Sequence, residues 1–563
     1  MYFRCFCARD TRLERSGTRV WNLSFLSFEV KTSYGALGTF VVLATSHNLL
    51  TYVAKSLVCV KINNKFSLFS YSQCKYFKTD YRVLHKSEVY TVTCTTKASK
   101  GIKEAVIYDD AYLILKKQKT EGRSDNKWNL VLVGIDTISR ARLVKSMPKT
   151  AEYLQRHGWL DFRGLQKIGY NTLPNLGALL TGQNLNTIYK TCVGRMDACN
   201  HLMIWERFRK AGYKTAYSED NLSLPDTFYN LKGFKVVPTN HYTRPFYIDR
   251  ERSTGNLICA KKLPSSEHML NYAYDFVNMY RLDSFFGVFW INSISHNSNY
   301  LPTLHDENMM KFFEKINSTG ALRNTFIAFV SDHGIRFGSS RVPIEAYYEE
   351  RLPMLYIWIP IRFREQYPLE YHNLKVNQNR LVTPYDLHLT FQNILDLRNQ
   401  NNTSNTTVAC KSCMSLFHEI PESRVCADVE VNEKWCSCRT LVPIERNDTG
   451  ASASLELATS YLQDVALKVE TKPCTKCKRL QLDAILRTHV SRERDRNIYV
   501  VAFKMKPINI NYEATVVEKD GKYKIADKIY SMNAFGSAEC LKNMYDKAYC
   551  MCEKDVCPKD KHG

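Results

Sequence analysis

The chain has 563 residues, enough to bury a large core and to form about two folded domains. Its 78 Lys and Arg outnumber its 56 Asp and Glu, which gives a net charge of +22. No basic run is interleaved with aromatic residues, so the charge does not indicate nucleic-acid binding and instead favours anionic substrates, glycans or membrane surfaces.

Near the N-terminus, an uncharged and mostly apolar segment covers residues 34–54. Its 21 residues are enough to cross a bilayer as a helix. Six basic residues lie in the tail 1–33, so the positive-inside rule places that tail in the cytoplasm. We therefore expect a type II membrane protein with an extracellular or lumenal body. A cleaved signal peptide, and hence a secreted protein, is the alternative.

Residues 55–123 are predicted to form a small β-rich segment that contains cysteines, and residues 124–440 a larger α/β domain. In that domain, the apolar runs 128–135, 285–291 and 326–330 predict buried strands. The first ends at Asp136 and the third is followed by Asp332 and His333. Ligands bind at the carboxyl ends of such strands, and oxygen and nitrogen donors suit zinc. The alternative is an ordinary turn in which Asp332 caps a helix.

Between the first two strands, Thr172 and Pro174 predict the start of a helix that stops at Gly182. A hydroxyl there faces free N–H groups and the positive end of the helix dipole, which suits a phosphoryl or sulfuryl group. A nearby metal ion would make it a nucleophile. The alternative is that Thr172 is only a helix cap.

Residues 441–563 are predicted to form a cysteine-rich α+β module. Helical spacing covers 451–470, strand-like runs cover 498–505 and 512–517, and a turn at Asp520-Gly521 leads to a third strand over 523–530.

Seventeen of the 19 cysteines follow residue 55, and six N-glycosylation sequons accompany them. Dense cysteine with sequons favours the secretory pathway and disulfide bonds, although the pairing cannot be read from the sequence. The alternative is zinc binding by Cys410-x-x-Cys413 and Cys474-x-x-Cys477. The sequons are at Asn221, Asn317, Asn401, Asn402, Asn405 and Asn447.

In combination, the strand ending at Asp136, the Thr172-Leu-Pro-Asn175 helix start and Ser331-Asp-His-Gly334 resemble the alkaline-phosphatase superfamily. The chain is most similar to one animal branch, the domain of unknown function 229 family, over roughly residues 125–440. The stretches that carry this resemblance are 136–140, 170–175, 212–220, 295–297, 331–338, 350–353 and 383–388.

The resemblance implies an α/β fold, an alkaline-phosphatase-like three-layer sandwich with a mostly parallel central sheet. Small disulfide-rich N-terminal and C-terminal α+β parts would accompany it. The resemblance also implies that Asp136, Thr172, Asp332 and His333 surround one zinc ion, with Thr172 as the nucleophile. His296 matches a ligand of the second ion in two-zinc members of the superfamily.

The chain departs from the two-zinc pattern. Asn292 stands where those enzymes carry an Asp, and their late histidine in a glycine-rich loop is missing. His388 and Asp386 are possible substitutes, although their surroundings predict a packing helix. One or two zinc ions are therefore both compatible with the sequence. No Cys-x-Pro-x-Arg motif is present for the formylglycine of ordinary sulfatases.

Arg140, Arg336 and Arg341 are candidates for orienting an anionic substrate, because the guanidinium fork matches phosphate geometry. The predicted function is a membrane-anchored or secreted, metal-dependent phosphate-ester hydrolase or phosphotransferase. Its substrate would be a phosphate- or sulfate-bearing small molecule, glycan or lipid. The alternative is a non-catalytic extracellular or lumenal binding protein on the same scaffold.

Overall fold

The computed structural model describes residues 106–120, 127–221, 233–247, 251–254, 257–298, 300–397, 409–533 and 538–554. Before residue 106 it describes seven strands and Glu88. The sequons at Asn401, Asn402 and Asn405 lie outside the described residues.

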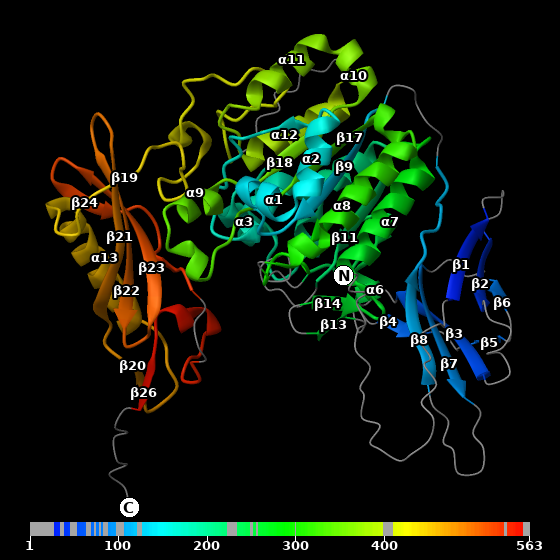
Figure 1. Ribbon diagram of the computed structural model, residues 1–563, viewed down its shortest axis with the longest axis horizontal. Helices are drawn as coiled ribbons and strands as arrows, with labels where there is room; N and C mark the ends of the chain where they lie inside the picture. The colour runs from blue at the N-terminus through cyan, green and yellow to red at the C-terminus, as the bar shows by residue number, and fades with distance from the viewer. Residues whose placement is uncertain are drawn as a thin grey trace, which may run out of the picture.

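The N-terminal strands form two antiparallel sheets, drawn in blue in Figure 1. The first sheet contains β1 (Phe28–Ser33), β2 (Thr39–Ala44) and β6 (Asp80–Arg82). The second contains β3 (Val53–Asn63), β4 (Phe69–Tyr71), β5 (Lys75–Phe77), β7 (Val89–Thr96) and β8 (Val106–Leu113).

Strand β2 lies within the segment 34–54, for which a membrane-spanning helix was predicted. It pairs with β1 and β6, so the predicted helix is wrong for these six residues. Thr39, Val41 and Val42 are β-branched, and β-branched residues favour the extended backbone of a strand. In the described part of the chain, no helix is both long and apolar enough to cross a membrane.

A seven-stranded mixed sheet forms the centre of the molecule, in the order β10-β18-β17-β9-β16-β11-β12 (Figure 1). The strands from β17 to β12 are parallel, and β18 is antiparallel to β17. The bounds are β9 (Asn129–Ile135), β10 (Leu160–Asp161), β11 (Lys214–Glu219), β12 (His241–Tyr242), β16 (Phe285–Ile291), β17 (Thr325–Val330) and β18 (Leu355–Trp358).

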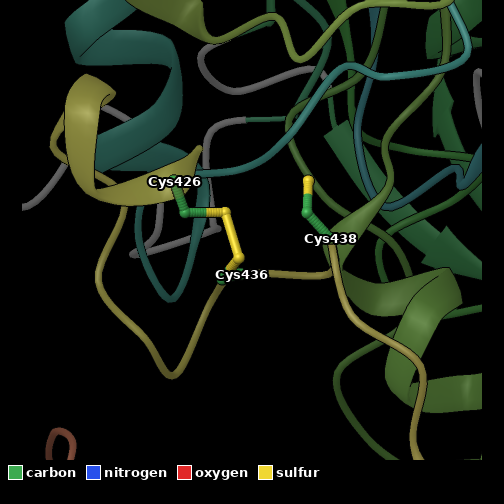
Figure 2. A group of neighbouring side chains, drawn as sticks. All are labelled: Cys426, Cys436 and Cys438. Carbon is green, nitrogen blue, oxygen red and sulfur yellow. A yellow bond between two sulfur atoms is a disulfide. The ribbon is translucent and has the colours of Figure 1, made fainter. Parts of the chain in front are cut away.

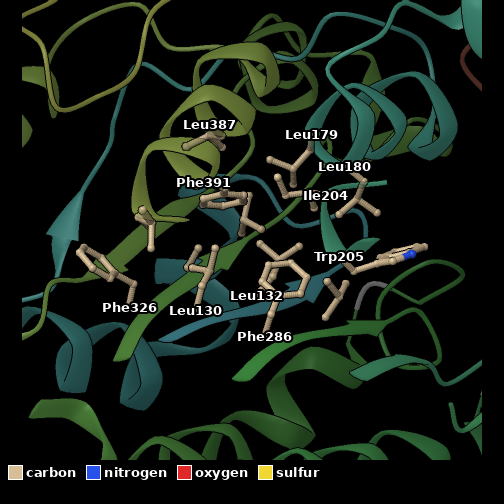
Figure 3. Packing of buried hydrophobic residues seen from close by; sticks show 14 of the residues in the cluster. Leu130, Leu132, Leu179, Leu180, Ile204, Trp205, Phe286, Phe326, Leu387 and Phe391 are labelled. Carbon is tan, nitrogen blue, oxygen red and sulfur yellow. The ribbon is translucent and has the colours of Figure 1, made fainter. Parts of the chain in front are cut away.

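Helices cover both faces of this sheet, which confirms the three-layer α/β architecture. Leu130 and Leu132 of β9 pack against one helical layer, which Figure 3 shows with Leu179 and Leu387. This layer contains α3 (Thr172–Thr181), α4 (Leu185–Thr191), α5 (Ile204–Lys210), α10 (Ile361–Gln366), α11 (Pro368–Asn377) and α12 (Pro384–Asp396).

Val131 and Val133 face the opposite layer, because successive side chains of a strand point to opposite faces. Its helices are α1 (Arg140–Ser146), α2 (Pro148–Arg156), α7 (Ser265–Tyr280) and α8 (Leu301–Ser318). Burial on both faces explains why these strands are continuous apolar runs in the sequence. Smaller elements of this region are β13 (Glu251–Thr254), β14 (Leu257–Ala260), β15 (Leu263–Pro264), α6 (Arg244–Tyr247) and α9 (Glu345–Arg351).

The C-terminal module is an antiparallel sheet with α13 (Thr449–Leu467) packed against it, and Figure 1 shows it beside the central domain. The predicted helix, the first two strands and the hairpin turn are confirmed, but the third predicted strand, 523–530, ends at Ile525. The 12-residue strand β21 was not predicted. The strands are β19 (Val442–Pro443), β21 (Gln481–Arg492), β22 (Asn497–Lys506), β23 (Ile510–Lys519), β24 (Lys522–Ile525) and β25 (Tyr530–Ser531). Strands β20 (Thr475–Cys477) and β26 (Cys552–Lys554) pair separately.

Disulfides confirm the expectation drawn from the cysteine content. The bonds between described residues include Cys192–Cys199, Cys410–Cys413, Cys426–Cys436, Cys477–Cys550 and Cys540–Cys552. The alternative of zinc binding by paired Cys-x-x-Cys motifs is therefore wrong, because Cys410, Cys413 and Cys477 are all oxidised. Figure 2 shows the Cys438 thiol beside the Cys426–Cys436 disulfide.

Candidate metal centre

Thr137 links the carboxyl ends of strands β9 and β17 through hydrogen bonds. This residue follows Asp136 and has a φ of 62°, a left-handed backbone conformation that is rare for threonine. Its N–H donates to Asp332 Oδ1 at 3.2 Å, and its hydroxyl donates to Asp136 Oδ1 at 2.7 Å. The strained residue therefore fixes both carboxylates at the carboxyl edge of the sheet.

Helix α3 presents Thr172 in its first turn. The helix begins at Thr172, and its N-cap is Asn171, one residue earlier than the sequence predicted. The Asn175 side chain accepts from the Ile168 N–H at 2.8 Å and donates to the Asn171 carbonyl at 2.8 Å. These bonds hold the turn that leads into the helix, and Thr172 itself is fully buried.

His333 is held as a neutral ring with one nitrogen available. Its Nδ1 lies 2.8 Å from the carbonyl oxygen of Gly334, and because a carbonyl only accepts, Nδ1 carries the proton and Nε2 keeps its lone pair. Nε2 lies 3.1 Å from Asp332 Oδ2 and 3.7 Å from Asp136 Oδ1. Burial, followed by the positive charges of Arg336 and Lys167, lowers the pKa of His333 well below its ordinary value.

Gly334 lets the loop after β17 pass close to α9. Its N–H donates to the carbonyl oxygen of Glu350 at 3.0 Å. A Cβ atom at this position would lie 2.1 Å from the carbonyl oxygen of Glu349, so a larger residue would displace the loop. The glycine in the Asp-His-Gly sequence is thus required by packing beside the site.

Four polar side chains at this point are buried and have atoms without a hydrogen-bond partner. These atoms are Asp136 Oδ2, Thr172 Oγ1, Asp332 Oδ2 and His333 Nε2. Asp136, Asp332 and His333 each offer one ligand atom, and these atoms lie within 4.8 Å of one another. Unpaired buried polar atoms are costly, and two neighbouring carboxylates repel each other.

In the absence of a bound cation, the carboxyl group of Asp332 is difficult to ionise. Burial raises the pKa of Asp332 well above its ordinary value, and the negative charge of Asp136 adds to the rise. The Thr172 hydroxyl and the Thr137 N–H oppose it. A bound cation would stabilise both carboxylates, and a set of carboxylate oxygens with one imidazole nitrogen fits zinc. The residues present therefore fit the implied metal.

His296 is not part of this group. It is half-buried, and its Nδ1 lies 2.8 Å from Asn297 Oδ1. Asn292, at the end of β16, is fully buried and neither atom of its amide group has a hydrogen-bond partner. Of the five predicted metal ligands, the structure thus brings together Asp136, Asp332 and His333, with Thr172 beside Asp332.

The possible substitute ligands on α12 have structural roles. His388 Nδ1 lies 2.9 Å from the Leu179 carbonyl oxygen, and its Nε2 lies 2.8 Å from Gln392 Nε2. Asp386 accepts from the Thr383 N–H at 2.8 Å and from Arg424 at 2.9 Å. The packing helix predicted for this segment is confirmed.

The three candidate arginines differ in their surroundings. Arg140 forms a two-pronged ion pair with Asp161, with distances of 2.9 and 2.6 Å. Arg341 pairs with Glu350 inside the protein. Arg336 is nearly fully buried, and its guanidinium carbon lies 4.9 Å from the ring centre of Tyr170. Of these three, Arg336 is the one whose charge acts on His333.

Sequence reasoning missed Lys167. Its ammonium group is fully buried, lies 2.6 Å from Glu350 Oε1, and is 4.0 Å from the ring centre of Trp435. Burial lowers the pKa of Lys167 to about 7. No sequence signal marks it, because its partners come from remote segments. Thr137 was also passed over, although its place directly after the strand-end Asp136 was a usable signal.

The sequence model of the family described as "Protein of unknown function (DUF229)" matches residues 39–486. The chain belongs to this family. The DUF229 membership predicted from the motifs is thereby confirmed. No curated protein sequence matches the chain significantly.

Solved structures show distant likenesses to this DUF229 protein. A protein in the alkaline phosphatase superfamily from Vibrio parahaemolyticus has 12% identity and a TM-score of 0.38, over 76% of this chain and 86% of that one. The lipoteichoic acid synthase LtaP from Listeria monocytogenes has 14% identity and a TM-score of 0.34, over 56% and 77%. The C-terminal periplasmic domain of EcEptC from Escherichia coli has 12% identity and a TM-score of 0.34, over 49% and 84%.

Proposed function

We propose that this DUF229 protein is a zinc-dependent enzyme that transfers a phosphoryl group from an ester to water or to an acceptor alcohol. The observation that carries the proposal is the convergence of unpartnered Asp136, Asp332, His333 and Thr172 atoms in a buried site. A non-catalytic binding protein has no need for a buried nucleophile beside a ligand set of this kind.

One zinc ion would be held by Asp136, Asp332 and His333, with Thr172 beside it. When bound, zinc would lower the pKa of the Thr172 hydroxyl and withdraw negative charge from the phosphoryl oxygens. The Gly334 carbonyl keeps His333 in the tautomer whose Nε2 has a lone pair. Thr137 keeps both carboxylates in place through its two hydrogen bonds.

Thr172 would act as the nucleophile. Its oxygen bonds to phosphorus while the bond from phosphorus to the ester oxygen breaks, and the alcohol leaves with the proton that Thr172 gives up. Water or an acceptor alcohol then attacks the phosphothreonine, and Thr172 regains a proton. The positive end of the α3 helix dipole and the positive charge of Arg336 would stabilise the anionic group.

The substrate would be a phosphate ester on a small molecule, glycan or lipid, and a sulfate ester is the related alternative. The high net positive charge supports an anionic substrate. The disulfides support work in an oxidising compartment, which we propose to be the secretory-pathway lumen or the extracellular space.

Two substitutions at Thr172 test the nucleophile. We expect Thr172→Ala to lower the rate of p-nitrophenyl phosphate hydrolysis by about a thousandfold or more, and Thr172→Ser to retain measurable turnover because it keeps a hydroxyl. Acid-quenched wild-type protein should carry phosphate on Thr172, as found by peptide mass spectrometry. Equal rates for the wild type and Thr172→Ala would contradict the proposal. Absence of turnover in zinc-supplied wild type would favour the binding protein.

A further inference from the structure

An aromatic stack joins the C-terminal module to the candidate site. Tyr170 lies two residues before Thr172, and its ring is stacked on that of Tyr530 from β25. The ring centres are 3.7 Å apart and the planes differ by 9°. Tyr530 also contacts Trp435, with ring centres 6.1 Å apart. Tyr530 of the C-terminal module thus packs against Tyr170, which lies two residues before the proposed nucleophile Thr172.

The same Tyr170 ring supports Arg336. The guanidinium carbon lies 4.9 Å from the Tyr170 ring centre and 5.0 Å from that of Phe337. Phe337 meets Tyr170 edge to face, with centres 6.5 Å apart and planes at 83°. A planar guanidinium on an aromatic face is held in both position and orientation, so movement of Tyr170 would move the charge.

The backbone provides a second link between the Arg336 loop and the module. The Gly338 N–H donates to the carbonyl oxygen of Met532 at 2.9 Å, directly after β25. Strand β25 is fixed in turn by β23, where Ser531 pairs with Tyr512. The segment 530–532 therefore makes two contacts near Arg336, one with the Tyr170 ring and one with the Gly338 N–H.

We propose that Tyr530 is a positioning residue, which acts through Tyr170 to hold the Arg336 guanidinium where it binds the substrate's phosphoryl group. This inference rests on the proposed function for its substrate. Under this proposal, the C-terminal module forms part of the substrate-binding site. The aromatic ring of Tyr530, and not its hydroxyl, would position Tyr170, because the two rings are stacked face to face.

Three variants of the full-length protein test this role. Tyr530→Ala removes the ring, Tyr530→Phe keeps it, and Tyr523→Ala removes a ring of the same module that contacts Tyr499 instead. We expect Tyr530→Ala to raise KM for p-nitrophenyl phosphate by about tenfold, with kcat within about threefold of the wild type. Tyr530→Phe and Tyr523→Ala should match the wild type, and all three should keep its zinc content.

A second readout reports on Arg336 without turnover. Phenylglyoxal modifies accessible arginines, and peptide mass spectrometry gives the rate at Arg336. Because Arg336 is nearly fully buried, we expect slow labelling in the wild type and in Tyr530→Phe, and labelling about fivefold faster in Tyr530→Ala. Wild-type labelling and KM in Tyr530→Ala would overturn the inference, as would equal losses in Tyr530→Phe. An inactive wild type would overturn the proposed function, while the labelling rates would still decide whether Tyr530 holds Arg336.

Discussion

His333 and His388 show how hydrogen bonds decide the role of a buried histidine. Both are fully or almost fully buried, and each has Nδ1 near a carbonyl oxygen. The Nε2 of His388 faces the side-chain amide of Gln392, whereas the Nε2 of His333 has no hydrogen-bond partner and lies beside two carboxylates. One ring therefore joins two helices, and the other is suited to bind a cation.

The pH dependence of stability should report on His388. Burial lowers its pKa to about 4, so between about pH 6.5 and 4 the unfolded chain binds more protons than the folded chain. The stability that comes from the neutral ring is present above about pH 6.5 and is lost as the pH falls toward 4. In His388→Asn, which keeps a donor near Leu179, we expect the free energy of unfolding to fall less steeply, by up to about 1.4 kcal/mol per pH unit.

Urea unfolding at about pH 7, 6 and 5 measures these slopes. The matched control is the same substitution at the exposed His201. Wild-type slopes in both variants would contradict the assignment of His388 as a buried neutral residue.

At this scale, the sequence was informative where the chemistry is local. Asp136 directly follows one apolar strand, and Asp332 and His333 lie within three residues of the end of another, so their convergence could be predicted from strand ends. The pairing of Arg140 with Asp161 could not, because nothing in either residue's neighbourhood identifies the other. Side-chain pairing between remote segments depends on tertiary packing, which one sequence does not reveal.

At the scale of elements, burial pattern decided which predictions succeeded. The runs 128–135 and 326–330 became β9 and β17 because both faces of a central strand are covered. Helix α3 begins at Thr172 and ends before Gly182, whose φ of 70° suits glycine. Strand β21 was missed, and its first four residues, Gln481–Ala484, are exposed and mix apolar with polar side chains. Within the predicted spanning segment, residues 39–44 form β2 instead, because apolar content alone does not separate a spanning helix from a strand; residues 34–38 and 45–52 lie outside the described residues.

For the whole molecule, a buried ion network connects the central domain to the C-terminal sheet. Glu513 of β23 lies 2.8 Å from Arg351 of α9, and it also pairs with Arg341 and Arg487. Glu350, next to Arg351, accepts the Gly334 N–H on its carbonyl oxygen. The network thus links the sheet to the loop that carries His333.

Removal of the Glu513 charge should destabilise the protein strongly. In Glu513→Gln the volume is kept, but the guanidinium groups of Arg341, Arg351 and Arg487 lose their shared carboxylate while they stay buried. We expect the free energy of unfolding to fall by about 3–5 kcal/mol. Chemical denaturation measures the change, and Glu518→Gln on the same strand, where the carboxylate is part-exposed, should cost less than about 1 kcal/mol. Similar losses in the two variants would argue against the network.

Zinc content tests the central claim most directly. Mass spectrometry on the purified full-length protein, after zinc is supplied and excess is removed, should give one zinc ion per chain. Asp332→Ala, which deletes a ligand but leaves the fold to be checked by circular dichroism, should lose that ion. Retention of zinc by a folded Asp332→Ala variant, or a folded wild type that binds none, would contradict a metal centre at Asp136, Asp332 and His333.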